Sequence, residues 1–352
     1  MSAPVIELPP ISLIESVAAG RRQRTKRRRL FIAVLGVGVL LGFALTLMLG
    51  QSFTPPGDVI RVIWGEDVPG ASFTVGRLRL PRAILSIVAG LSFGLAGAAY
   101  QTMLRNALAS PDIIGISYSA SAAAVVGIIF FSLDGPAVST LSVVASLSVA
   151  LLIYLLSFKG AVLGTRLILI GVGVAALLES VIAFALSRAG AWDMQEALRW
   201  LSGSVNGASW EQSLPALVAL PIFGALLLSR SRDLETLRLG DDTSAALGVR
   251  VAATRVTVMI AATGLIAFAT AAAGPISFVA FLSGPIAARV VGRSGSLLLP
   301  AALTGAVLVL TADYAGQFLL PSRYPVGIVT GALGAPYLIY LIVRSNRSVG
   351  SL

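Results

Sequence analysis

Ten apolar segments constrain this chain more than any other feature of its sequence. A helix of about 20 apolar residues spans the hydrocarbon core of a bilayer. Soluble domains carry about 25% charged residues, whereas this chain of 352 residues has 12%. The sequence therefore predicts an all-α, polytopic membrane protein with about ten transmembrane helices. The expected spans are 30–50, 81–104, 113–132, 136–157, 163–187, 212–229, 253–273, 276–292, 297–318 and 325–343.

The distribution of basic residues predicts which ends of the spans are cytoplasmic. Seven of the 26 Lys and Arg residues lie in RRQRTKRRR (21–29), directly before the first span. Cytoplasmic segments are enriched in Lys and Arg, which favours a cytoplasmic N-terminus, and ten spans return the C-terminus to the same side. The seven basic residues then left outside are Arg61, Arg77, Arg79, Arg82, Arg188, Arg199 and Arg323.

This topology predicts a multi-pass protein of the inner (cytoplasmic) membrane with one transmembrane domain. We expect a cytoplasmic basic tail over 1–29, a transmembrane domain over 30–345 and a short tail over 346–352. The basic tail borders a span, so we expect it to contact anionic lipid. Nucleic acid is not an expected partner, because the charge is not spread over a binding face.

The composition excludes several kinds of chemistry. The chain contains no Cys and no His, which are the usual ligands of zinc and haem, so we expect no metal site. Neither Lys26 nor Lys159 lies in a G-x-x-x-x-G-K-[ST] loop for ATP. No nucleophile–base pair is apparent, so we expect no enzymatic activity, no catalytic residues and no bound cofactor.

Small residues and two carboxylates stand out inside the spans. Gly90, Gly94 and Gly97 recur at near-helical spacing, which favours close helix packing, with a role in substrate passage as the alternative. Glu179 and Asp313 lie in the fifth and ninth spans. Burying a carboxylate in a membrane is costly, so each is expected either to hold the structure together or to take part in ion coupling.

The segment SRSRDLETLRLGDDTSAALGVR (229–250) carries eight charged residues. It predicts two short helices, one capped by Asp233 and the other by Asp241 or Asp242. Both are shorter than the roughly 12–15 residues that an isolated helix needs, so they must pack against protein. A transporter without a nucleotide-binding loop needs a surface that receives force from an ATPase. We call residues 230–250 the platform; a solvated linker is the alternative.

The sequence LGDDTSAALGV in the platform resembles the cytoplasmic coupling segment of the FecCD-type permeases. These are membrane subunits of ABC importers for iron–siderophores, haem and cobalamin. The resemblance extends in family order over nearly the whole chain, through RLRLPRAILSIVAGLSFGLAGAAYQTMLRNALASPDIIGIS (77–117), RWLSGSVNGASW (199–210), AAGPISFVAFLSGPIAARVVG (272–292), AALTGAVLVLTAD (301–313) and YPVGIVTGALGAPYLIYLI (324–342).

The resemblance implies a permease subunit that passes a ferric siderophore, or haem or cobalamin, by ATP-driven alternating access. Its implied partners are two ATPase subunits that bind ATP and Mg²⁺, a second permease subunit and an extracytoplasmic substrate-binding protein. ATPase coupling is assigned to Leu239, Gly240, Asp241, Ala246, Leu247 and Gly248. Docking of the binding protein is assigned to Arg79, Arg82 and Arg323, and the passage to Glu179 and Ser180.

Three positions depart from the family pattern. Ile286 replaces the usual histidine, Gln317 the usual arginine, and Arg323 the usual glutamate. These changes alter the external charge and favour a heterodimer with a close homologue over a homodimer. An ion-coupled secondary transporter, with Glu179 and Asp313 as relay groups, is the alternative from another class. ATP dependence distinguishes the two.

Overall fold

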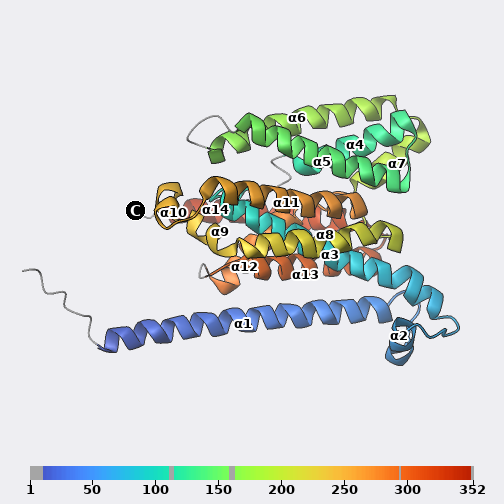
Figure 1. The fold of residues 1–352 in the computed structure, drawn as a ribbon. Coiled ribbons are helices and arrows are strands. Elements are labelled where there is room, and N and C mark those ends of the chain that lie inside the picture. The colour runs from blue at the N-terminus through green and yellow to red at the C-terminus, as the bar shows by residue number, and fades with distance from the viewer. Residues whose placement is uncertain (1–10, 111–114, 158–162, 293–294, 350–352) are drawn as a thin grey trace, which may run out of the picture.

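A computed structural model of the chain describes residues 11–110, 115–157, 163–292 and 295–349, and all regular structure in these ranges is helical (Figure 1). The all-α prediction is confirmed. The long helices are α1 (Ile11–Met48), α3 (Leu80–Met103), α4 (Ile116–Phe131), α5 (Gly135–Ser157), α6 (Leu163–Arg188), α8 (Trp210–Ser229), α11 (Val251–Ala273), α12 (Val279–Val291), α13 (Leu298–Phe318) and α14 (Val326–Val349). The shorter ones are α2 (Pro56–Ile63), the π-helical η1 (Ser72–Arg79), α7 (Ala191–Leu201), α9 (Ser231–Leu237) and α10 (Asp241–Ala246).

The predicted spans agree with the long helices. Among the described residues, 7 helices are long and apolar enough to cross a membrane, and α4, α12 and the start of α14 are shorter apolar helices. The first helix differs most from the expectation, since α1 begins at Ile11 and runs without a break through the basic stretch. Arg, Lys, Gln and Ala are good helix formers, so the helix continues where the apolar run does not.

Helix α3 forms the centre of the fold and packs against α8, α11, α12 and α13. Its glycines permit this closeness. A Cβ on Gly90 would collide with the backbone of Gly305 in α13, and one on Gly97 with the backbone of Ala280 in α12. The prediction of tight helix packing is thus confirmed at these two positions, because contact between backbones requires residues without side chains.

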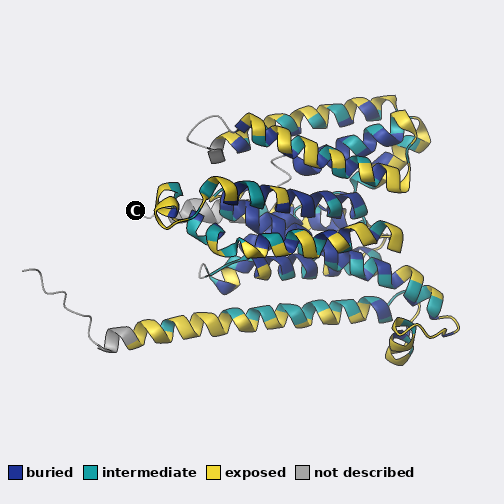
Figure 2. Cartoon of the chain, viewed as in Figure 1, coloured by how far each residue is buried: buried dark blue, intermediate teal, exposed yellow. Residues whose placement is uncertain are grey.

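The remaining helices lie around this centre (Figures 1 and 2). Helix α1 runs along one edge and packs on α13, while α4, α5, α6 and α7 form the opposite edge. The most apolar window of α3 is 83% buried inside the protein, whereas that of α6 is only 17% buried (Figure 2). The more apolar of the two helices is therefore the less buried one: α3 is enclosed by protein, and α6 is open to lipid or to another subunit.

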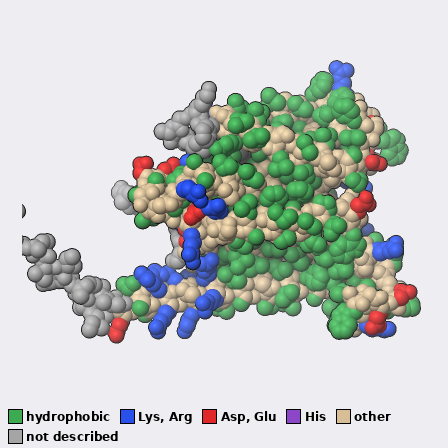
Figure 3. Space-filling model, in the orientation of Figure 1, with side chains coloured by type: hydrophobic (Ala, Val, Ile, Leu, Met, Phe, Trp, Pro, Cys, Tyr) green, Lys and Arg blue, Asp and Glu red, His purple; other side chains and the backbone are tan. Residues whose placement is uncertain are grey.

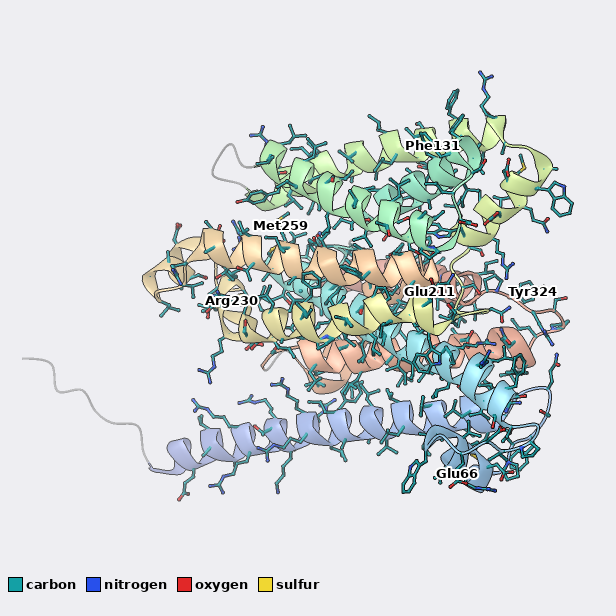
Figure 4. The ribbon with its side chains drawn as sticks, turned by 45° about the vertical axis from the view of Figure 1, so that its right-hand side comes forward. Glu66, Phe131, Glu211, Arg230, Met259 and Tyr324 are labelled. Atoms are coloured by element: carbon teal, nitrogen blue, oxygen red, sulfur yellow. The ribbon has the colours of Figure 1, made fainter. Side chains whose placement is uncertain are left out.

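The two ends of the helix bundle differ in composition. Helices α9 and α10 lie at one end, together with the Arg-rich start of α1, and a broad apolar surface separates them from the other end (Figure 3). Helices α2 and α7 lie at that other end, and Figure 4 shows Arg230 far from Glu66 and Tyr324. We call the end with α9 and α10 the inner end of the molecule, and the end with α2 and α7 the outer end.

Candidate functional site

The platform is a folded unit at the inner end. Leu234 and Leu237 of α9 are buried against the rest of the protein. The chain then turns at Gly240, whose φ of +106° lies in a region that favours glycine. The Ser244 hydroxyl donates to the carbonyl oxygen of Thr236 at 2.8 Å and so ties α10 to α9. The prediction of two short, packed helices is confirmed, and a solvated linker does not describe this segment.

The predicted helix caps are wrong. The cap residues are Arg230 for α9 and Gly240 for α10, and neither makes a side-chain capping hydrogen bond. The Asp233 carboxylate instead accepts hydrogen bonds from Arg230 and Thr254, both at 3.4 Å. Asp233 therefore binds neighbouring side chains instead of capping its helix. Its bond with the Arg230 guanidinium is of a kind that is stronger than a neutral hydrogen bond. Asp241 is also used in contacts with arginines, which are described below.

The platform leaves its apolar tips uncovered. Leu239 and Leu247 are each 63% exposed, and Ala246 is exposed beside Leu247. Gly248 ends the second helix with φ +86° and has no heavy atom within 4 Å of where a Cβ would lie. Two exposed leucines next to buried ones are suited to contact with another protein. Their role in ATPase coupling stays a prediction.

Asp241, the first residue of α10, is partly exposed and binds two arginines of the protein. Its Oδ1 accepts a hydrogen bond from Arg255 Nη2 of α11 at 2.8 Å and one from Arg105 Nη2 at 3.2 Å. Arg105 lies in the corner that follows α3. Burial raises the pKa of the nearby Glu235 carboxyl, against the opposite effects of Arg238 and Arg28. The start of α1 therefore contributes its charge to the same end.

At the outer end, Arg79 is buried inside the protein. Its Nη1 donates to the carbonyl oxygens of Leu47 and Met48 and to the Thr54 hydroxyl, and its Nη2 donates to Ser52. These bonds fasten the end of α1 and the following loop to η1. The guanidinium faces inward, so in this conformation the predicted docking residue acts as an internal clamp.

Arg82 forms a bidentate ion pair with Asp313. The Nε–Oδ2 and Nη2–Oδ1 distances are 2.8 and 2.7 Å, and the two side chains are 14% and 6% exposed. The pair joins α3 to α13 and accounts for the carboxylate in the ninth span. Arg323, in the loop after α13, is exposed. Of the three arginines predicted to dock the binding protein, it alone is turned to solvent; the docking role itself stays a prediction.

A cavity of about 740 Å³ lies between α4 and α6 on one side and the start of α12 and the middle of α14 on the other. Small, hydroxyl and apolar side chains line most of it, and Glu179 is the one carboxylate among its described lining residues. The neighbouring Ser180 is exposed on α6 and donates to the carbonyl oxygen of Ala176 at 2.9 Å. Glu179 is therefore placed in a cavity wall, as a passage residue requires, while Ser180 is satisfied by its own helix.

The two intramembrane carboxylates do not form a relay. Asp313 of α13 is neutralised by Arg82, whereas Glu179 of α6 lines a cavity. Proton and sodium pathways use chains of polar or ionisable groups, and the described part of this cavity wall contains a single carboxylate. Within the described ranges, no group of three or more His, Cys, Asp or Glu residues could hold a metal ion.

A second hollow, of about 590 Å³, was not predicted from the sequence. It lies at the outer end beneath α7 and is lined on that helix by Trp192, Gln195, Glu196 and Arg199. The three- and four-residue spacing of these side chains could have predicted a polar helix face over this stretch, because such spacing places side chains on one face of a helix. Helix α7 is too short and too polar to appear in a search for membrane spans.

Comparison with known proteins identifies the family. The FecCD transport family matches residues 38–344. The chain belongs to the FecCD transport family. The match runs from the last turns of α1 into α14 and covers every long helix between them, so the resemblance found in the separate sequence motifs is confirmed.

Two curated members and one solved structure illustrate the relationship. The ferric enterobactin transport system permease protein FepG of Escherichia coli K12 is 37% identical over 318 residues, covering 89% of this chain and 93% of that protein. The iron(3+)-hydroxamate import system permease protein FhuG of Bacillus subtilis is 34% identical, covering 92% and 100%. A metal-chelate type ABC transporter in an inward-facing conformation superposes with a TM-score of 0.80 at 26% identity, covering 89% and 98%. This FecCD chain is accordingly a membrane-spanning transport component.

Proposed function

We propose that this chain is the permease subunit of an ABC importer that passes ferric siderophores across the cytoplasmic membrane by ATP-driven alternating access. The platform carries this proposal. It is a folded unit with two exposed leucines at one end of a FecCD chain that has no nucleotide-binding loop of its own. Such a unit is suited to receive a push from an ATPase subunit, which would bind and hydrolyse ATP with Mg²⁺.

The proposed orientation follows from the two ends. The inner end, with the Arg-rich start of α1, lies in the cytoplasm together with both termini, in keeping with the excess of basic residues there. The ATPase docks on Leu239, Ala246 and Leu247. The outer end receives the substrate-binding protein, to which Arg323 offers an exposed guanidinium.

A second permease subunit completes the proposed passage. Leu169 and Leu177 of α6 and Leu333 of α14 are exposed, as expected of faces that meet another subunit or lipid. The departures at Ile286, Gln317 and Arg323 favour a close homologue over an identical copy in this role. Glu179 then lies in or beside the passage as a polar contact, with Ser180 next to it on α6.

The proposed substrate class rests on the relatives and on the cavity. FepG and FhuG are named for ferric enterobactin and iron(3+)-hydroxamate. This chain has no Cys and no His, and the residues described in its cavity wall offer one carboxylate among small, hydroxyl and apolar side chains. Such a wall is poor at removing iron from a chelator, so the metal would cross inside its organic ligand.

Uptake into proteoliposomes tests the proposal. The complete importer is assembled with its ATPase, second permease and binding protein, and the entry of ⁵⁵Fe-labelled siderophore is followed. We expect uptake that requires ATP and is indifferent to a proton gradient. Uptake driven by a proton gradient without ATP would support the secondary-transporter alternative. Single cysteines at positions 239 and 323 should react with impermeant reagents from opposite sides of the membrane, and reaction from one side would contradict the orientation.

A further inference from the structure

The corner that follows α3, residues 104–110, is a compact turn with an unusual backbone. Arg105 has φ +52°, which side-chain-bearing residues rarely adopt. The turn is closed by a bond from the Asn106 amide to the Gln101 carbonyl oxygen at 3.1 Å and one from the Leu108 amide to the Asn106 side chain at 2.9 Å. Strained positions of this kind persist only where surrounding contacts fix them, and they are found at switches.

This corner also forms part of the cavity wall. Leu108 and Ser110 line the 740 Å³ cavity at its inner end, where α3 has already ended. On the other side, Gln101 Nε2 donates to the carbonyl oxygen of Phe281 at 3.0 Å, and Phe281 lines the same cavity. A displacement of the corner would therefore change the cavity wall at Leu108 and Ser110, which we call the inner mouth of the cavity.

The platform is attached to this corner by one ion pair. Arg105 Nη2 lies 3.2 Å from Asp241 Oδ1, and the two side chains are 43% and 34% exposed. Arg105 also reaches the turn between α9 and α10, since a Cβ on Gly240 would lie 3.6 Å from its Nη1. Both partners remain hydrated, so the pair can lengthen and reform at little cost, unlike a fully buried pair.

We propose that the Asp241–Arg105 ion pair transmits movement of the platform to the corner at 104–110, and so opens and closes the inner mouth of the cavity. Asp241 and Arg105 are thus positioning residues that act through Leu108. The inference rests on the proposed function, since the movement comes from a docked ATPase. It assigns Asp241 to an inward link rather than to the contact surface formed by Leu239 and Leu247.

A second link from Asp241 has a different character. Arg255 Nη2 binds the same oxygen at 2.8 Å, and its side chain is only 11% exposed. It joins α10 to the base of α11, which is packed against α3 and α8. We assign this bond to anchoring, because a buried guanidinium on an enclosed helix has little freedom to move. The two arginines can therefore be separated by experiment.

Labelling of a single cysteine introduced in place of Leu108 tests the link. The chain has no cysteine of its own, so Leu108→Cys gives one reactive thiol at the inner mouth. In the complete importer, the rate of maleimide labelling is compared without nucleotide and with ATP and vanadate. We expect the two rates to differ by about fivefold, as a shift between two populated states produces. Asp241→Asn or Arg105→Gln should make the two rates equal while nucleotide binding persists.

Controls and contrary outcomes are defined by neighbouring side chains. Asp242→Asn removes the same charge one residue along the helix, from an exposed carboxylate, and should keep the nucleotide response. If the labelling rate at position 108 still responds to nucleotide in Arg105→Gln, the proposal is overturned, even if Asp241→Asn fails to assemble. A nucleotide response that is lost in Arg255→Gln but kept in Arg105→Gln also overturns it. An unresponsive thiol at position 108 in an importer with normal ATP-driven uptake overturns this inference alone, whereas uptake independent of ATP overturns the proposed function.

Discussion

The inner and outer ends of this permease are both held together by ion pairs, but they expose different groups to a partner. Asp241 and Arg105 join elements at the inner end, and Arg82 and Asp313 join α3 to α13 at the outer end. The platform at the inner end exposes two leucines, whereas the outer end exposes Arg323 together with large apolar side chains such as Trp64 and Trp192. Apolar tips that are covered on binding contribute affinity, while rim charges mainly steer encounter. The comparison predicts strong coupling inside and salt-sensitive docking outside.

The largest expected effect comes from removing one partner of the outer ion pair. Arg82→Ala leaves Asp313 buried without its counter-charge, which should cost about 3–5 kcal/mol of stability. Thermal or denaturant unfolding of the detergent-solubilised protein measures the loss. Combining it with Asp313→Asn should restore part of the stability, and the exposed Arg323→Ala serves as the matched control. An unchanged stability in Arg82→Ala would show that this arginine is free for docking after all.

A substitution at the tip of the platform should have the next largest effect. Leu247→Asp places a charge on the surface that the ATPase is expected to cover, so uptake per ATP hydrolysed should fall about tenfold. Membrane insertion should be unaffected, because Leu247 is exposed. Uptake and phosphate release are measured together in proteoliposomes, with Leu247→Met as control. Normal coupling in a stably inserted Leu247→Asp protein would remove the platform from the mechanism.

At the outer end, reversing the exposed charge should have a smaller effect. Arg323→Glu should raise the binding-protein concentration for half-maximal uptake about threefold, since rim charges act on encounter. High salt should narrow the difference from wild type, because it screens exposed charges. Arg323→Lys should behave like wild type. A change that does not depend on salt would show that the outer end binds its partner by direct contact, as proposed for the inner end.

The smallest effect is expected from a substitution of Glu179, in the cavity between the two ends. Glu179→Gln keeps the shape and most of the hydrogen bonding of the side chain while deleting its charge. Among the described residues of the cavity wall Glu179 is the one carboxylate, so no acid described there joins it in a relay, and ATP-driven uptake should stay within about threefold of wild type. Complete loss of uptake in a well-folded variant would make Glu179 a group that acts directly on the substrate.

The positions of the spans were determined by the sequence itself. The predicted run over 163–187 corresponds to α6 at Leu163–Arg188, and the run over 136–157 to α5 at Gly135–Ser157. The reason is physical, because the thickness of the hydrocarbon core sets the length of an apolar helix whatever surrounds it. The same reasoning missed α2 and α7, whose short amphipathic sequences have no run of bilayer length, and it placed the start of α1 too late.

The partners of the charged groups were decided only by the tertiary structure. Arg82 and Asp313 are separated by 231 residues, and Arg105 and Asp241 by 136. The sequence shows that each side chain carries a charge, but the attraction between a guanidinium and a carboxylate depends on a separation of a few ångströms. That separation is set by the packing of α3 against its neighbours. The family motif predicts that Arg82 docks a partner protein, which stays a prediction, whereas its pairing with Asp313 follows from the close approach of α3 and α13.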